Sequence, residues 1–325
     1  MATIMGMTQA ICMTAIGGPD VLTTIDHPIG EPGPGEARIR HAAIGVNFID
    51  IYHRVGRYPQ PANGILSVEG AGTVKAVGEG VIGLSPGMRV AYAGAPVGAY
   101  AEERTLPAER LIPLPDDIAF ERAAGTYLRG LTAQMLLHRV RKIGPGDIVL
   151  VHAGAGGLGQ ILLRWGRCLG ATMITTVGHP DKVEIARRAG AHHVVLRSQT
   201  WWEQVREASG GRGVDLACDG IGGPAFARTL DCLAPFGIAV SLGEPAGPIA
   251  PIALDTLRSV LVGRPSVMAY VADPAHYAAA AADLIDFLRA EPFDPISATY
   301  PLEEAARAQN DLEHGRNTGS VLLIP

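Results

Sequence analysis

The stretch that decides the fold is Asp147-Ile148-Val149-Leu150-Val151-His152-Ala153-Gly154-Ala155-Gly156-Gly157-Leu158-Gly159, in which a run of apolar residues ends in glycines. A continuous apolar run of this length is typical of a strand that is covered on both faces in a parallel sheet. The segment that follows, residues 158–169, has the apolar spacing of a helix. The stretch therefore predicts a strand, a tight turn and a helix that begins at the glycines.

The turn satisfies the pattern G-x-G-x-x-G, and each glycine has an expected task in binding phosphate. Gly154 permits the tight turn, Gly156 lets the backbone approach a pyrophosphate, and Gly159 lets the helix pack closely on the strand. The N–H groups at the helix N-terminus favour an anion. We expect a dinucleotide site, with an ordinary glycine-rich turn as the alternative. The expected contacts are Gly154, Ala155, Gly156, Gly157, Leu158 and Gly159.

Strand and helix patterns alternate after this turn. Apolar runs at 171–177, 193–196, 214–218 and 238–242 are further candidate strands, and residues 182–189 have a helical pattern. Such alternation indicates a parallel sheet with crossover helices. We predict an α/β fold with a doubly wound parallel sheet in this part of the chain.

The first third of the chain has a different texture. Its strand-like runs, 37–41 and 70–77, are separated by Gly/Pro clusters, which favours a small β-rich barrel or sandwich. Helical periodicity covers 120–140. Beyond the parallel sheet, the sequence predicts two helices, 275–290 and 303–312, and a closing strand, 320–324.

Length and composition bound the class of protein. A chain of 325 residues suggests two domains, and 47% hydrophobic residues exclude disorder. A net charge of −5 without a Lys/Arg run excludes a nucleic-acid partner. We find no apolar run long enough to span a membrane and no basic leader before Met7, and the four cysteines are scattered. We expect a cytoplasmic protein with free, buried thiols.

The end of the second predicted strand favours NADP(H) over NAD. Gly178 stands where an NAD site places an acid, so no carboxylate would repel a 2′-phosphate. His179 lies at the same strand end, Lys182 lies within reach of the pocket and Arg197 follows the third strand. Asp181 is expected to cap the next helix. Both cations could instead be solvated surface charges.

Zinc and hydrolase chemistry are not expected. Catalytic zinc needs three protein ligands, yet the first domain has one cysteine, Cys12, and the lone histidines His41 and His53. Val68-Glu69 stands where a His–Glu pair would be sought. No G-x-S-x-G elbow is present.

Several motifs, taken together, resemble a known family over 10–325, almost the whole chain. They are Gly17-Gly18-Pro19-Asp20-Val21-Leu22, Gly45-Val46-Asn47-Phe48-Ile49-Asp50, Gly56-Arg57-Tyr58-Pro59, Glu69-Gly70-Ala71-Gly72, Arg129-Gly130-Leu131-Thr132, the residues 152–159, Arg264-Pro265-Ser266 and the ending 319–325. The sequence is similar to the zinc-independent, NADPH-dependent quinone oxidoreductases (zeta-crystallin type) of the medium-chain dehydrogenase/reductase superfamily. The loop at Asn47 resembles that family's version of the loop that carries a zinc-binding cysteine in alcohol dehydrogenases.

The resemblance implies a discontinuous arrangement. A GroES-like β-rich catalytic domain would comprise 1–128 and 272–325, and a Rossmann domain that binds NADPH would comprise 129–271. The cofactor would lie in the cleft between the domains. A homodimer would form through the edge of the Rossmann sheet at 259–271.

The resemblance also implies site residues. The side chains that would line the nicotinamide and quinone site are Asn47, Asp50, Tyr52 and Tyr58. Contacts along the cofactor would come from Thr132, Asp219, Gly220, Ser241, Leu242, Gly243, Ser266 and Val267. Three departures stand out. Arg197 replaces a frequent tyrosine beside the 2′-phosphate, the basic residue Arg316 is shifted by one position, and Glu244 brings a carboxylate near the cleft.

The expected reaction is reduction of a quinone by NADPH without a metal ion. Quinones are electron-poor, so positioning in a dry cleft would supply most of the catalysis. Tyr52 or Tyr58 could donate a hydrogen bond to a quinone oxygen, or simply pack. A reductase of 2-alkenals or other enones, and a non-catalytic NADPH-binding protein, remain as alternatives.

Overall fold

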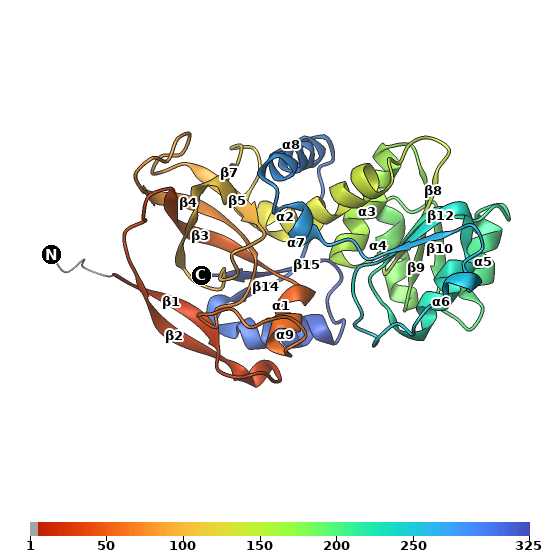
Figure 1. The fold of residues 1–325 in the computed structure, drawn as a ribbon, viewed down its shortest axis with the longest axis horizontal. Helices are drawn as coiled ribbons and strands as arrows, with labels where there is room; N and C mark the ends of the chain where they lie inside the picture. The colour runs from red at the N-terminus through yellow and green to blue at the C-terminus, as the bar shows by residue number, and fades with distance from the viewer. Residues whose placement is uncertain (1–5) are drawn as a thin grey trace. The chain divides into compact units, whose positions relative to one another are not determined.

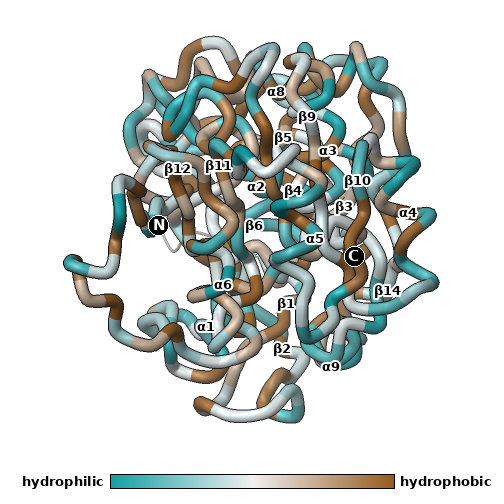
Figure 2. The backbone as a smooth tube through the Cα atoms, turned by 90° about the vertical axis from the view of Figure 1, so that its right-hand side faces the viewer, coloured by the Kyte–Doolittle hydropathy of each residue, from teal (hydrophilic) through white to brown (hydrophobic). Residues whose placement is uncertain are grey.

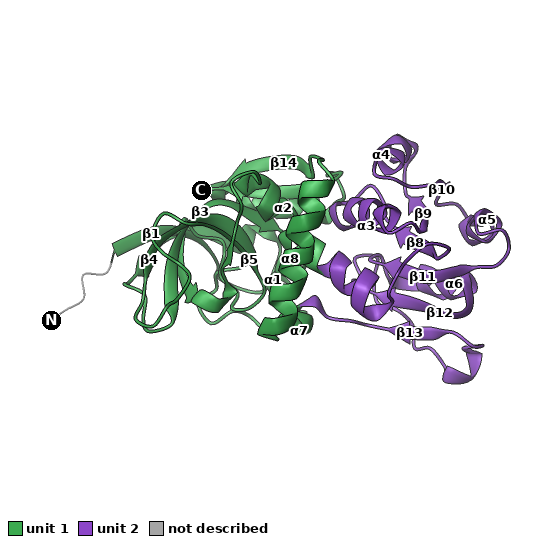
Figure 3. Cartoon of the chain, turned by 90° about the horizontal axis from the view of Figure 1, so that it is seen from above, with its two compact units in different colours: residues 1–131, 268–325 green, residues 132–267 purple. Residues whose placement is uncertain are grey.

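The computed structural model describes residues 6–325; the first residues of the N-terminal segment considered above for a leader, 1–5, lie outside the described residues. The chain forms two compact units (Figure 3). Unit 1 comprises Met1–Leu131 and Met268–Pro325, and unit 2 comprises Thr132–Val267. The chain therefore leaves unit 1 and returns to it.

Unit 2, which contains the strands labelled β8, β9, β10 and β12 in Figure 1, has a six-stranded sheet in the order β10-β9-β8-β11-β12-β13 (Figure 3). Every neighbouring pair of strands in this sheet is parallel. Its elements are β8 (Ile148–His152), α3 (Gly157–Cys168), β9 (Thr172–Val177), α4 (Val183–Arg188), β10 (His193–Leu196), α5 (Trp201–Ala208), β11 (Val214–Asp219), α6 (Phe226–Asp231), β12 (Leu233–Ser241) and β13 (Leu261–Gly263). Hydrophobic residues run along β11 and β12 (Figure 2). The chain order reverses between β8 and β11, and ligands bind at the carboxyl ends of strands at such a point.

Unit 1 has a mixed sheet in the order β14-β15-β3-β4-β5-β7, with β6 also paired to β3, and a separate antiparallel β1-β2 hairpin. Its elements are β1 (Gly6–Met13), β2 (Leu22–Ile29), β3 (Glu36–Val46), α1 (Phe48–Arg54), β4 (Glu69–Val77), β5 (Arg89–Ala93), β6 (Glu103–Pro107), β7 (Ile112–Pro113), α2 (Phe120–Gln134), α7 (Val267–Tyr270), α8 (Pro274–Ala290), β14 (Ile296–Pro301), α9 (Ala305–Glu313) and β15 (Ser320–Ile324). The two units confirm the predicted α/β class, since one is β-rich and the other has a parallel sheet of the Rossmann kind.

Two expectations from the sequence, one about a helix and one about the cysteines, are corrected by the structure. The helix expected over 120–140 is α-helical only to Gln134 and continues as a π-helical turn, Met135–Val140. The expectation of buried thiols is wrong for two cysteines, because Cys168 is exposed at the end of α3 and Cys12 is only half-buried. Within residues 6–325, no helix has both the length and the hydropathy needed to cross a bilayer.

Candidate functional site

The turn between β8 and α3 is built differently from the expected one. The left-handed residue is Ala153, at φ 55°, and Gly154 does not have a positive φ. Gly154 is needed for another reason, because a Cβ there would overlap the Thr175 hydroxyl and lie 3.0 Å from Leu163 Cδ1. The expected task of Gly154 is therefore corrected: it lets the turn lie against β9.

Gly159 brings the first turn of α3 against the end of β8. A Cβ at this position would lie 2.7 Å from the Cα of Gly154 and 3.0 Å from the carbonyl carbon of Ala153. Both atoms belong to the backbone and cannot move aside cheaply. The close approach of helix and strand thus depends on this glycine.

The N-terminus of α3 suits an anion. Gly156 is the N-cap residue, and among the described residues no side chain caps the helix and no acid stands in its first turn. The first N–H groups of a helix have no partner within the helix, and they carry partial positive charge. The backbone of 156–159 therefore fits the pyrophosphate of a dinucleotide.

A buried polar network joins the carboxyl ends of three strands. The Nε2–H of His152 donates to Thr229 Oγ1 at 2.9 Å, and the Thr229 hydroxyl donates to Asp219 Oδ2 at 3.2 Å. Nδ1 of His152 then accepts from the Thr176 hydroxyl at 2.8 Å. Burial lowers the pKa of His152 to about 4, so the ring is neutral and its tautomer is fixed by its partners. The sequence reasoning did not select His152 or Thr229.

Two expected cofactor residues lie at the ends of β11 and β12. Asp219 Oδ1 accepts from the N–H groups of Ile221 at 2.7 Å and Gly222 at 2.9 Å, which shapes the loop that begins at Gly220. The hydroxyl of Ser241 is buried and has no hydrogen-bond partner within the described part of the chain. A buried hydroxyl without a partner is costly, so Ser241 fits a polar group of a bound cofactor.

The loops beyond β12 and β13 hold the remaining expected contacts. The N–H of Leu242 donates to the carbonyl of Asp219 at 2.7 Å, which places Leu242 and Gly243 beside the β11 loop. Glu244 Oε1 pairs with Arg264 NH1 at 3.0 Å, so its carboxylate is balanced by a cation two residues before Ser266. Ser266 is exposed, and Thr132 and Val267 are half-buried.

The end of β9 is open, as a 2′-phosphate pocket requires. A Cβ at Gly178 would meet no atom within 4 Å, and Lys182 is half-buried nearby in sequence. The prediction that Asp181 caps the next helix is wrong. The ring of His179 caps the short helix Pro180–Lys182, and it accepts a hydrogen bond from the N–H of Asp181. Arg197 follows β10 directly, is exposed, and helps to lower the pKa of His152.

In unit 1 the loop before α1 places Asn47 and Asp50 together. The carboxylate of Asp50 accepts from the Asn47 N–H at 2.8 Å and from the Tyr100 hydroxyl at 3.0 Å, both at Oδ2. Its Oδ1 is buried and has no partner within residues 6–325. Burial raises the pKa of Asp50 to about 7, although the two donors oppose the shift. Asp50 can therefore hold a proton near neutral pH.

The two expected tyrosines lie against each other. Tyr52 and Tyr58 make an edge-on contact with ring centroids 5.5 Å apart. Tyr52 is buried, with the guanidinium carbon of Arg57 5.1 Å from its ring centroid, whereas Tyr58 is 38% exposed. Tyr58 is thus the one with an accessible surface for a ligand.

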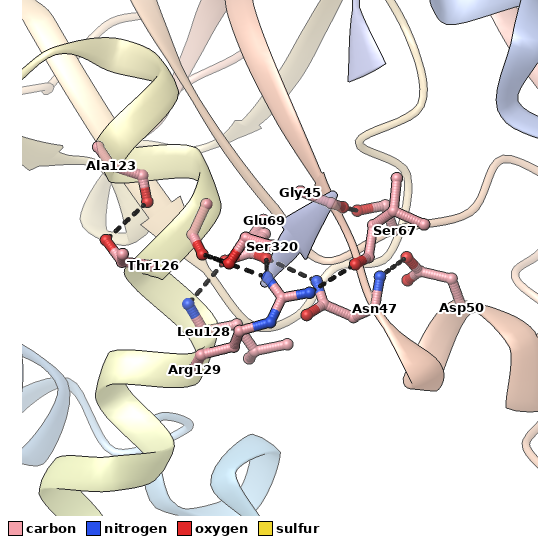
Figure 4. Close-up of polar contacts among 12 residues, drawn as sticks. Gly45, Asn47, Asp50, Ser67, Glu69, Ala123, Thr126, Leu128, Arg129 and Ser320 are labelled. Carbon is pink, nitrogen blue, oxygen red and sulfur yellow. Dashed lines mark hydrogen bonds and ion pairs between the residues drawn. The ribbon is translucent and has the colours of Figure 1, made fainter. Parts of the chain in front are cut away.

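Glu69 and Arg129 complete this cluster, and the sequence reasoning had given them no role (Figure 4). Glu69 is fully buried, and its Oε1 accepts from Asn47 Nδ2 at 2.6 Å. Arg129 NH1 lies 3.5 Å from the same oxygen. The guanidinium of Arg129, which is always charged, therefore pairs with the carboxylate of Glu69, a group that could otherwise be a ligand for a metal ion.

Two further observations bear on the expected residues. Arg316 is exposed and pairs with Asp311 at 2.6 Å, within unit 1. Over residues 6–325, no group of three or more His, Cys, Asp or Glu side chains is placed to hold a metal ion.

Comparisons with known proteins agree with both units. A model of the alcohol dehydrogenase GroES-like domain matches residues 33–116, and one described as zinc-binding dehydrogenase matches residues 157–286. The chain is 40% identical to a 2-haloacrylate reductase of Burkholderia sp over 98% of this chain and 99% of the relative. It is 40% identical to a quinone oxidoreductase of Pseudomonas aeruginosa over 98% and 100%. The solved structure of Escherichia coli quinone oxidoreductase complexed with NADPH superposes with a TM-score of 0.93 at 36% identity, covering 98% of this chain and all of that one.

Proposed function

Because the chain belongs to the quinone oxidoreductases of the medium-chain dehydrogenase/reductase superfamily, we propose that it is an NADPH-dependent enzyme that reduces quinones without a metal ion. The proposal of a bound NADPH rests on two observations within residues 6–325: no side chain caps the N-terminus of α3, and the buried hydroxyl of Ser241 has no hydrogen-bond partner. The open end of β9, with Lys182 and Arg197 as its cations, favours a 2′-phosphate.

When bound, the reduced nicotinamide supplies the reducing equivalents. The chain's own residues bind, orient and handle protons. The backbone of 156–159 holds the pyrophosphate, the hydroxyl of Ser241 holds a polar group farther along the cofactor, and Asp219 shapes the loop beside it. In unit 1, Asp50 holds a proton near neutral pH, and the exposed Tyr58 offers its hydroxyl and ring face to the acceptor, with the buried Tyr52 packed against it.

No metal ion is needed for this reaction. A quinone is already electron-poor, and its reduced form takes protons readily, so positioning contributes most of the rate. The chemistry of the donor set agrees, because Arg129 competes with any metal ion for the carboxylate of Glu69. The four cysteines are free thiols, which supports a reducing, cytoplasmic setting.

A second candidate substrate is an activated alkene such as a 2-haloacrylate or an enone. The similarity to the 2-haloacrylate reductase equals that to the Pseudomonas aeruginosa quinone oxidoreductase in identity. The exposed guanidinium of Arg264 would suit the carboxylate of an acrylate, but Glu244 already pairs with it. This pairing favours the uncharged quinone.

The test is oxidation of NADPH by chelator-treated protein, with 1,4-benzoquinone, 2-chloroacrylate and a 2-alkenal as separate acceptors. We expect fastest turnover with the quinone. Faster turnover with an alkene would overturn the quinone assignment in favour of the second candidate. Binding of NADPH without turnover of any acceptor would identify a non-catalytic binder.

We also propose a homodimer through the edge of the unit 2 sheet. Strand β13 lies at that edge and is exposed, with Leu261 and Val262 at 50% and 38% of their full accessible surface. Phe236, whose N–H donates to Ser259, is also exposed beside them. An exposed apolar edge strand invites pairing with a second copy. Light scattering of the wild-type protein and of Leu261→Asp tests this: a wild-type monomer would refute the dimer.

A further inference from the structure

The buried carboxylate of Glu69 is hydrogen-bonded to the side-chain amide of Asn47. Glu69 Oε1 accepts from Asn47 Nδ2, and Oε2 accepts from the N–H of Leu128, both at 2.6 Å. Glu69 begins β4, whereas Leu128 lies in α2, so the carboxylate is anchored to two elements. It cannot rotate away from Asn47 without losing a hydrogen bond.

Arg129 fixes the same loop through its backbone. Its NH2 donates to the carbonyl of Val46 at 2.7 Å, and its NH1 donates to the carbonyl of Gly125 at 3.3 Å. Val46 directly precedes Asn47. One guanidinium therefore holds the backbone before Asn47 and, through Glu69, the side chain of Asn47 (Figure 4).

The backbone leaves room for this carboxylate only because residue 45 is glycine. A Cβ on Gly45 would lie 2.5 Å from Glu69 Cδ and 2.6 Å from the carbonyl oxygen of Ala124. The carboxylate thus occupies a space built for it, rather than a loose cavity.

The contacts also decide which end of the Asn47 amide faces Glu69. Both oxygens of Glu69 accept N–H groups, and Arg129 lies beside one of them. Burial raises the pKa of Glu69 above its ordinary value, and Arg129 with the donors Asn47 and Leu128 opposes this rise by favouring the ionised carboxylate. An ionised carboxylate only accepts hydrogen bonds, so it takes the amide nitrogen and leaves the amide oxygen to face away.

We propose that Glu69 and Arg129 are positioning residues that lock the Asn47 amide with its nitrogen on Glu69 and its oxygen turned away, so that this oxygen can accept a hydrogen bond from a bound ligand. This inference rests on the proposed function. An oxidised quinone has only acceptor oxygens and gains nothing from such a group, whereas the cofactor has donors in its carboxamide and its ribose hydroxyls. The oxygen of the Asn47 amide therefore suits the cofactor rather than the oxidised quinone.

The first experiment measures the Kd of NADPH by fluorescence titration, without an acceptor, for wild type and Glu69→Gln. A glutamine has a single acceptor oxygen, which cannot serve both Asn47 Nδ2 and Leu128 N–H, so the Asn47 amide is free to turn. We expect a Kd about tenfold higher, as for the loss of one hydrogen bond, and a KM for 1,4-benzoquinone within about twofold of wild type. An unchanged Kd, or a larger rise in the quinone KM, would overturn the inference.

A double-mutant cycle tests whether Glu69 acts through Asn47. If it does, Glu69→Gln/Asn47→Ala binds NADPH no more weakly than Asn47→Ala alone, because the oriented amide is already gone. Additive losses would mean that Glu69 acts independently, and would refute the positioning role.

The 3-acetylpyridine analogue of NADPH, which lacks the carboxamide N–H, identifies the donor. If the carboxamide is the partner, wild type binds the analogue about tenfold more weakly than NADPH, and Glu69→Gln binds both alike. If a ribose hydroxyl is the partner, wild type binds both alike and Glu69→Gln weakens both.

Two variants guard against a general structural effect. Ser320→Ala removes a buried hydrogen bond to Gly125, beside Arg129, without touching Asn47, and should leave the Kd of NADPH within about twofold. An equal loss in Ser320→Ala would show that loosening of the region, not the amide, is responsible. If Glu69→Gln does not fold, Glu69→Asp is the substitute. Its shorter side chain keeps the charge but moves the carboxylate oxygen away from Asn47 Nδ2, so it should also raise the Kd of NADPH. Failure of wild type to bind NADPH would instead refute the proposed function.

Discussion

Replacing Asp50 by Asn should remove a pH dependence of stability that the buried carboxyl imposes. Burial raises its pKa from 3.8 to about 7. Between these two values the unfolded chain has released a proton that the folded chain still binds, so raising the pH favours unfolding. Below pH 3.8 the group has no effect, and above pH 7 its penalty is complete and constant.

The size of the effect follows from the two pKa values. A difference of about 3 units, at about 1.36 kcal/mol per unit, gives an upper figure of about 4 kcal/mol. Roughly 3 kcal/mol of this falls between pH 5 and pH 8. Asparagine keeps an oxygen that accepts from the Asn47 N–H and the Tyr100 hydroxyl, but it does not titrate.

The assay is urea unfolding of wild type and Asp50→Asn at pH 5, 6, 7 and 8. The stability of wild type relative to the variant should fall by about 3 kcal/mol across this range, since other titrating groups are present in both proteins. Asp117→Asn is the control: Arg289 lowers the pKa of Asp117, so its titration lies below pH 5 and its difference from wild type stays flat. A flat difference for Asp50→Asn would refute a buried, proton-holding Asp50.

Three further experiments test the packing of the glycine turn, the 2′-phosphate pocket and the metal content. Gly159→Ala places a Cβ 2.7 Å from the Cα of Gly154 and should lower the free energy of unfolding by about 1–3 kcal/mol. The control Gly178→Ala adds a Cβ in open space and should leave the free energy of unfolding almost unchanged. Equal losses of stability in thermal unfolding would contradict the packing assigned to Gly159. Lys182→Ala should weaken NADPH about tenfold while leaving NADH nearly unchanged in fluorescence titrations, and equal losses for both would remove Lys182 from the 2′-phosphate pocket. Elemental analysis of the purified protein should find no stoichiometric zinc, and one zinc per chain would overturn the role given to Arg129 beside Glu69.

The parallel sheet of unit 2 was predictable because its signals are local. The apolar run of β8, the glycines after it and the helical spacing of α3 lie within about 20 residues, and β10 has the predicted bounds. What the pattern could not give was the inner geometry of the turn. The left-handed residue is Ala153, and only the neighbouring strand, through Thr175, explains why position 154 must be glycine.

The cluster around Asn47 was predictable only in part. Resemblance pointed to Asn47 and Asp50, but nothing in their spacing indicates that Asp50 is fully buried. Glu69 and Arg129 contact each other across 60 positions of sequence, and periodicity carries no signal for such a pair. The exposure of Cys168 escaped prediction for the same reason, since it depends on what packs against the end of α3.

The place of β15 has a consequence for biosynthesis. This strand, formed by residues 320–324, lies between β14 and β3 in the sheet of unit 1, and its partner β3 was made almost 300 residues earlier. Unit 2 is one continuous segment and can fold as soon as residue 267 has left the ribosome. Unit 1 must wait until the last strand is translated, because β6 pairs with residues 36–40 of β3 but residues 44–46 of β3 pair with β15. During that interval this end of β3 is open to wrong pairing.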